Sequence, residues 1–225
     1  MNNVQAPFIR IVNVVQEKNE HSSKNVAERP ATARRHQDLR RDLLEAAAAA
    51  IETEGLAGVR ARDLARAVGC SVGAIYNVFN ELDELILLVN AATLAGIDRH
   101  MHGIREAGPA TQLLALAAAY LDYAVANRRR WDALFSYSGP PERPLPDWFA
   151  QAQNAAFSHI DGPLAQLRPD IASPARALLS RSIFSAVHGI VALGLDKRIA
   201  PIELPVLRGQ LALVVRALIA GLPAL

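Results

Sequence analysis

The sequence predicts an all-α protein in which an N-terminal three-helix domain precedes a larger helical domain. Apolar residues recur at helical spacing from Leu39 onward, and no segment alternates with period two between turn residues. Glycine and proline pairs divide the chain into segments of helical length. The chain has 225 residues, 51% of them hydrophobic, which suffices for the cores of two domains. We expect about nine helices in total.

The first three predicted helices lie between residues 39 and 79. The first has one apolar face and an alanine-rich centre, and Gly55 is suited to end it. Ser71 is suited to cap the third helix after a tight glycine turn. The apolar face consists of Leu39, Leu43, Leu44, Ala47 and Ile51, the second helix spans 62–68, and the third ends near Phe79.

The remaining helices are delimited by caps, glycines and prolines. Asn80 caps a long fourth helix, with Asp83 three residues on as the returning side chain of a capping box. Four prolines make 139–146 a loop. The later helices are predicted at 111–127, at 128–136, from Asp147, from Ser173-Pro174 and at about 206–220.

Three regions follow from this pattern. Residues 1–35 are polar and aperiodic and are predicted to form a flexible, partly basic arm. Residues 36–97 form the three-helix domain and the start of the fourth helix, and 98–225 form the second domain. Between Lys24 and Arg41 there are six basic residues against two acidic ones. Such a run suits a phosphate backbone and is also typical of a solvated tail.

The second and third helices have the features of a helix-turn-helix unit, whose third helix enters the major groove of DNA. Gly69 permits the unusual dihedrals of the turn. Ser71, Gly73 and Ala74 keep the start of the third helix small, so that its backbone can approach phosphates. Ile75 and Phe79 lie four residues apart and dock the opposite face on the core; this set of features predicts a DNA-reading helix.

Residues 39–88 resemble the TetR family of transcriptional regulators. The segment that carries the resemblance is 63–79, DLARAVGCSVGAIYNVF, which follows an alanine-rich helix ending in glycine. The resemblance implies a ligand-responsive repressor that acts as a homodimer on a palindromic operator. In this mechanism a small molecule in the helical cavity moves the fourth helix, and the two reading heads no longer fit double-stranded DNA.

The resemblance also implies which residues lie at the DNA. The Tyr76 hydroxyl is expected to bond a phosphate, whereas Val72 and Asn77 face base edges. Val72 replaces a common lysine of the family and Arg60 replaces its serine or threonine cap. Asn77-Val78 departs from the frequent pair, so the operator preference is not inherited. The predicted DNA-binding residues are Arg40, Arg60, Arg62, Ser71, Val72, Gly73, Ala74, Tyr76 and Asn77.

The second half of the chain resembles a TetR subgroup with a Trp…His-Gly signature, here Trp131 and His188-Gly189. Aromatic residues are concentrated in this half, and a helical domain of this kind can enclose an apolar cavity with a few polar groups. The predicted effector is therefore a small apolar molecule. Its predicted contacts are Trp131, Phe135, Tyr137, Trp148, Phe184 and His188. A core histidine bonded to a neighbour is an equally supported interpretation of His188.

The last two helices carry more apolar surface than one partner helix would cover. Burial in a four-helix interface with a second copy is the expected solution. The apolar residues are Ile183, Val187, Ile190, Val191 and Leu195 in one helix and Leu207, Leu211, Val214, Val215 and Leu218 in the other.

Other function classes receive less support. The chain has no glycine-rich phosphate loop, nucleophile motif or Cys/His ligand set, so we expect no enzyme, cofactor or metal site. The single cysteine and the lack of a run of about 20 apolar residues favour a cytoplasmic protein without a membrane partner. The alternative function is a helical module that binds small molecules or proteins and reads DNA weakly or not at all.

Overall fold

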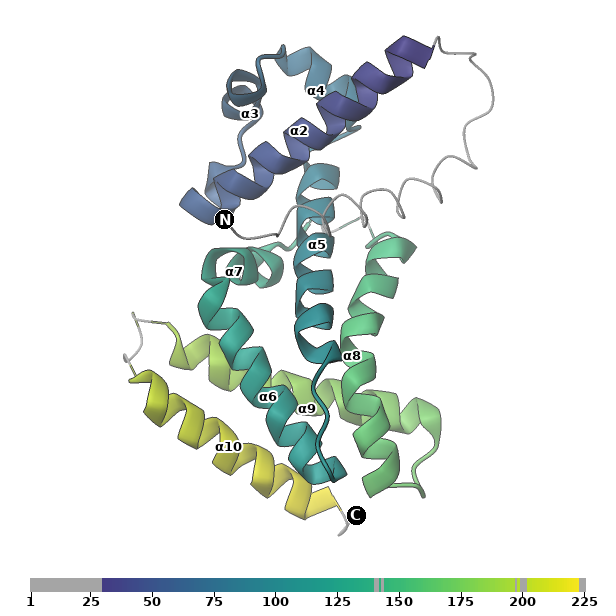
Figure 1. Cartoon of the computed structure of the whole chain (residues 1–225), viewed down its shortest axis with the longest axis vertical. Coiled ribbons are helices and arrows are strands. Elements are labelled where there is room, and N and C mark those ends of the chain that lie inside the picture. The colour runs from purple at the N-terminus through teal and green to yellow at the C-terminus, as the bar shows by residue number, and fades with distance from the viewer. Residues whose placement is uncertain (1–29, 140–141, 143, 197, 199–201, 223–225) are drawn as a thin grey trace. The chain divides into compact units, whose positions relative to one another are not determined.

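The computed structural model describes residues 30–139, 142, 144–196, 198 and 202–222, and within these ranges it contains no β-strand (Figure 1). The predicted all-α class is confirmed. Residues 1–29 of the predicted arm lie outside the described residues. The helices are α2 (Pro30–Glu54), the 3-10 helix η2 (Leu56–Gly58), α3 (Ala61–Val68), α4 (Val72–Val78), α5 (Leu82–His102), α6 (Pro109–Ala126), α7 (Arg128–Ser136), α8 (Asp147–Leu167), α9 (Ser173–Gly194) and α10 (Leu204–Gly221).

Most helix ends fall within two residues of their predicted positions, and the start of α2 is the exception. The helix begins at Pro30, so residues 30–35 of the predicted arm are its first turns. Proline is favoured at the first position of a helix, and the alanines and arginines that follow are good helix formers. Apolar residues recur at helical spacing only from Leu39 onward, so a prediction from that spacing starts the helix too late.

The cap of α5 differs by one residue from the prediction. The Asn80 backbone N–H donates to Glu84 Oε2 at 3.2 Å, so Glu84 is the returning side chain. The prediction of Asp83 in this role is wrong because α5 begins at Leu82, which places Glu84 at the third position of the helix.

The chain folds as two compact units. Among the described residues, the first comprises those of 30–95 and 129–150, and the second comprises those of 96–128 and 151–222. The predicted boundary at 97/98 lies close to the change of unit within α5. The described residues of 129–150, which the sequence places in the second domain, belong to the first unit instead. Arg130 pairs with Glu52 of α2 at 2.7 Å, and Ala133 belongs to the first core.

The first unit has a closed hydrophobic core. Leu43, Leu44 and Ile51 of α2, Ile75 of α4 and Leu85 of α5 are each 0% exposed. These helices come from the segments for which the sequence predicts apolar faces, and they pack on one another in a single cluster. The core therefore fixes α4 to α2 and α5 through one face only, and the opposite face of α4 stays free.

The second unit packs α6, α9 and α10 together. The Leu207 side chain of α10 packs directly on Gly194 of α9, so a side chain at this position would have to displace the leucine. A buried cluster of Leu113, Leu164, Ile183 and Leu222 closes one part of this unit. The glycine thus lets α9 and α10 pack closely.

The outer faces of α9 and α10 stay apolar and exposed. Both helices are long and apolar enough to cross a membrane by length and composition, although only 28% and 17% of their apolar windows are buried. Leu178 and Leu193 of α9 and Val206 and Leu213 of α10 are 55–65% exposed. A pair of such helices is also what a soluble core or interface produces, because either use requires an apolar face.

Candidate DNA-reading surface and effector-binding residues

The turn between α3 and α4 has the predicted geometry. Gly69 adopts φ 74°, in the left-handed region, and ends α3. The Cys70 backbone N–H donates to the Ala65 carbonyl at 2.9 Å, which tightens the turn. Ser71 then caps α4, because its hydroxyl oxygen accepts from the Ala74 backbone N–H at 3.1 Å. The predicted roles of Gly69 and Ser71 as turn and cap are confirmed.

The inner face of α4 is docked on the core. Ile75 and Phe79 are 0% exposed and Val78 is 8% exposed, as the four-residue spacing predicts for the first two. The arrangement gives α4 a fixed orientation before any DNA is bound, which lowers the entropic cost of recognition.

The outer face of α4 presents the predicted DNA-binding residues to solvent. Tyr76 is 50% exposed and Val72 is 36% exposed; Ser71, Gly73 and Asn77 are exposed too, and Ala74 is half-buried. A Cβ added to Gly73 would meet only the Ser71 hydroxyl, at 3.8 Å, so packing within the chain does not require glycine there. A small residue on this face instead permits close approach of a partner.

The three predicted arginines differ in their surroundings. Arg62 of α3 is exposed. Arg60 directly precedes α3, caps it without a side-chain hydrogen bond, and lies 3.6 Å from Asp63 and 3.9 Å from Glu54. Both guanidinium groups lie at the surface of the first unit, where weak ion pairs can be exchanged for phosphate contacts.

Arg40 is held within the first unit. Its guanidinium donates to the Val78 carbonyl at 3.1 Å and to Glu84 Oε1 at 3.3 Å, and it lies 4.5 Å from the centre of the Phe79 ring. Its side chain is only 13% exposed. Arg40 therefore links α2 to the end of α4 and the start of α5, and these contacts occupy the guanidinium that the sequence assigns to DNA. The basic run in the sequence did not reveal these partners, since all lie about 40 residues away.

The predicted effector-binding residues divide between the two units. In the first unit, Trp131 is 2% exposed and its ring lies 5.2 Å from that of Phe135. Tyr137 and Trp148 pack against the first core and line a cavity described below. These four residues belong to α7, α8 and the loop between them, and all four lie in the first unit.

In the second unit, Phe184 and His188 form an aromatic group with Tyr120. The Tyr120 hydroxyl and His188 Nδ1 are 2.8 Å apart, and the Phe184 ring stacks on the imidazole at 5.7 Å. Burial lowers the pKa of His188 below its ordinary value of 6.5, so the imidazole is neutral at neutral pH. The hydrogen-bonded interpretation of His188 is thus supported, and effector contact stays a prediction.

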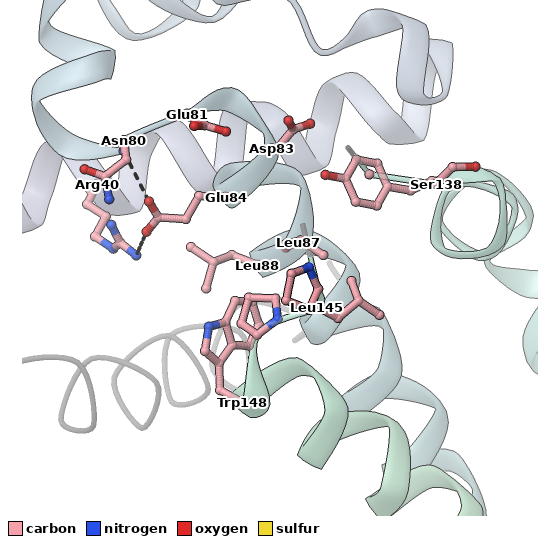
Figure 2. Close-up of a pocket in the computed structure, with 14 residues that line it drawn as sticks. Arg40, Asn80, Glu81, Asp83, Glu84, Leu87, Leu88, Ser138, Leu145 and Trp148 are labelled. Carbon is pink, nitrogen blue, oxygen red and sulfur yellow. Dashed lines mark hydrogen bonds and ion pairs between the residues drawn. The ribbon is translucent and has the colours of Figure 1, made fainter. Parts of the chain in front are cut away.

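A cavity of about 370 Å³ lies in the first unit, between the start of α5 and the segment that joins α7 to α8 (Figure 2). Arg40 and Glu84 lie at one part of its wall and Trp148 and Leu145 at another. Its volume falls in the range of small-molecule sites. The prediction of an effector cavity lined by Tyr137 and Trp148 thus has a counterpart, although in this unit and not with Phe184 or His188.

Two family models match the chain. Residues 43–89 match bacterial regulatory proteins of the tetR family, and residues 113–218 match the tetracycline-repressor-like C-terminal domain. The chain belongs to the TetR family. It is a DNA-binding transcriptional regulator, with the helix-turn-helix domain at the N-terminal end and the helical domain behind it.

Solved structures share the fold of this TetR-family chain. A protein of unknown function from Rhodococcus sp. RHA1 is 21% identical, with 81% of this chain and 94% of that chain covered and a TM-score of 0.65. A TetR transcriptional regulator from the same organism is 15% identical (83% and 97% covered, TM-score 0.60). A tetR-family regulator from Streptomyces coelicolor is 20% identical (82% and 81% covered, TM-score 0.61). No curated protein matches the chain.

The sequence analysis did not predict one candidate ligand-binding residue of this TetR-family chain. Asn90 of α5 is 0% exposed, and neither its side-chain nitrogen nor its oxygen has a hydrogen-bond partner among the described residues. An amide buried in this way costs about 1–3 kcal/mol unless a ligand or water satisfies it. The signal was present as a single polar residue in the apolar run Leu85–Ala92.

The described part of the chain was also compared with the requirements of a metal site. No group of three or more His, Cys, Asp or Glu side chains there is suited to hold a metal ion. His159 instead pairs with Asp98 at 2.7 Å, and His102 packs edge-on against the His159 ring.

Proposed function

We propose that the protein is a ligand-responsive repressor that binds a palindromic operator as a homodimer. The observation that carries the proposal is the exposed outer face of α4 on a helix whose inner face is fully docked. Two copies are needed because a palindrome has two half-sites, about 34–36 Å apart for one helical turn.

The proposed DNA contacts are those on the outer face of α4, together with Arg60 and Arg62. The Tyr76 hydroxyl bonds a phosphate, and Val72 and Asn77 contact base edges. Ser71, Gly73 and Ala74 line the start of the helix, where small side chains allow close approach. Arg60 and Arg62 supply charge that Val72 cannot.

The proposed dimer forms through α9 and α10. Ile183, Val187 and Val191 of α9 and Leu207, Leu211 and Val215 of α10, which the sequence assigns to the interface, are at most 8% exposed within one chain. The exposed residues Leu178, Leu193, Val206 and Leu213 are therefore the better interface candidates. A Cβ added at Gly189 of α9 or Gly209 of α10 has no neighbour within 4 Å, so the chain itself leaves space there for a helix of another copy.

The proposed effector is a small, mainly apolar molecule that enters the helical domain. Phe184 and His188 offer an aromatic face and a neutral imidazole in the second unit. Because α5 continues from the reading unit into the second unit, a shift of this helix would carry ligand binding to the DNA. The protein would act in the cytoplasm.

DNA binding is tested with a palindrome from the DNA beside the gene, by fluorescence anisotropy over a range of salt. Asn77→Ala should lower the affinity about fivefold to 100-fold and relax base preference, since a base contact is worth about 1–3 kcal/mol. Arg62→Ala should weaken binding to all duplexes and reduce the salt slope by about one.

Arg105→Ala is the matched control, because this exposed arginine lies between α5 and α6, outside the first unit and outside the two helices proposed for the dimer. It should leave both affinity and salt slope unchanged. Wild-type protein that ignores duplex DNA at low salt would favour the alternative, a helical binding module that does not read DNA.

A further inference from the structure

We propose that the first unit carries a binding site for a small organic cation with an apolar body, located in the cavity of Figure 2. The site is separate from Phe184 and His188, which belong to the other unit. The regulatory part of the proposal rests on the proposed function, because it requires that α4 reads DNA.

The apolar part of the cavity suits the body of such a ligand. Leu88, Leu145 and Trp148 lie together on one side of the cavity, and Tyr137 also lines it (Figure 2). Indole and phenol rings attract cations through their faces in addition to the hydrophobic contact. Aromatic walls therefore favour an ammonium carried on a hydrocarbon over a hydrated metal ion.

The charge around the cavity selects a cation. Among the described residues that line the cavity, Glu81, Asp83 and Glu84 are acidic and Arg40 is the one cation. Figure 2 shows these carboxylates at the opposite side from Trp148 and Leu145. Glu84 is already bonded to Arg40 and to the Asn80 backbone. Asp83 therefore remains as the lining carboxylate available to a positive group, and the acidic side chains around it disfavour an anion.

The half-buried carboxylate of Asp83 has no structural role among the described residues. No hydrogen bond or ion pair joins it to another described residue, although it lies in the first turn of α5 where Glu84 performs the capping. Withdrawing a carboxylate from water without a partner is unfavourable. An ammonium in the cavity would supply that partner.

The position of the cavity connects it to the reading helix. Glu84 lines the cavity and also holds Arg40, whose other nitrogen donates to the Val78 carbonyl at the end of α4. A bound cation competes with Arg40 for Glu84 and weakens this link between α2, α4 and α5. Cation binding should therefore lower the affinity for DNA.

Binding is tested on the full chain with benzyltrimethylammonium as the probe, and with uncharged benzyl alcohol and anionic benzoate for comparison. Binding is measured by the quenching of Trp148 fluorescence. The variant Trp148→Phe retains only Trp131 and so shows how much of the signal comes from that residue. We expect the cation to bind about tenfold or more tightly than benzyl alcohol, and benzoate not to bind.

Asp83→Asn should weaken cation binding about tenfold, as expected for the loss of one charge near the ligand. Asp122→Asn is the matched control: it removes an acidic group of the second unit, which pairs with Arg208, and should leave binding unchanged. Equal affinity for the cation and the alcohol, or unchanged binding by Asp83→Asn with a native thermal transition, would overturn the site.

DNA affinity measured with and without the probe tests the coupling. We expect about a fivefold loss of affinity in the wild type and none in Asp83→Asn. Unchanged DNA affinity with the cation bound would overturn the regulatory part and leave the site standing. If the chain binds no duplex at all, the proposed function fails, while the cation titration still decides the site.

Discussion

The two units differ in how completely they bury their apolar surface. The first unit closes its core around α2, α4 and α5, where five large side chains are fully buried. The second unit leaves whole faces of α9 and α10 in solvent, with Leu178 65% and Leu193 59% exposed. The comparison indicates that the reading unit is complete in one chain, whereas the second unit requires a partner to bury its surface.

The largest expected effect comes from opening the first core. Phe79→Ala should destabilise the protein by about 3–5 kcal/mol, because it removes a fully buried ring and the face on which Arg40 lies. Urea unfolding followed by tryptophan fluorescence measures it, since Trp131 and Trp148 both belong to the first unit.

Tyr76→Ala on the same helix is the control, since Tyr76 is 50% exposed. Its cost should be about 1 kcal/mol or less. An equal loss of unfolding free energy in the two variants would mean that α4 is not docked through one face. The core of the first unit would then not be closed within one chain.

An intermediate effect is expected on assembly. Leu193→Glu and Leu213→Glu place charges on the exposed faces of α9 and α10 and should convert a dimer to monomers without lowering the thermal stability of the monomer. Light scattering after size exclusion reports the mass. Val125→Glu, at an exposed apolar position of α6 in the same unit, should leave the dimer intact. Dimers that survive both leucine substitutions would place the interface elsewhere.

The smallest effect concerns pH and His188. Because burial lowers the pKa of His188 in the fold, the unfolded chain binds the proton at higher pH than the folded chain does. Stability is therefore fully present above the ordinary pKa of 6.5 and falls as pH drops toward the folded pKa. His188→Gln should flatten this dependence between about pH 5 and 7. Circular dichroism melts measure the slopes, and parallel slopes for wild type and His188→Gln would contradict the assignment.

Local patterns were sufficient for most of the helices and for the reading motif. Gly69, Ser71 and Phe79 act within four or five residues of their partners, so their roles as turn, cap and core anchor follow from spacing. The predicted start of α2 missed Pro30 because its first turns carry no apolar periodicity. The capping partner of Asn80 was misplaced by one residue because the first helical residue decides it.

The chain's own sequence determined the helical class, the turn and the docked face of α4, because each depends on contacts between near neighbours in the chain. Only the tertiary structure decided that Arg40 turns inward to Glu84 and Val78 and that Trp148 lines a cavity in the first unit. It also decided that Asn90 lies buried with no hydrogen-bond partner for its side chain among the described residues. These features join segments that lie about 40 or more residues apart or depend on what surrounds a side chain on all sides. Helical periodicity describes one helix at a time, and it does not say which other helix meets that face.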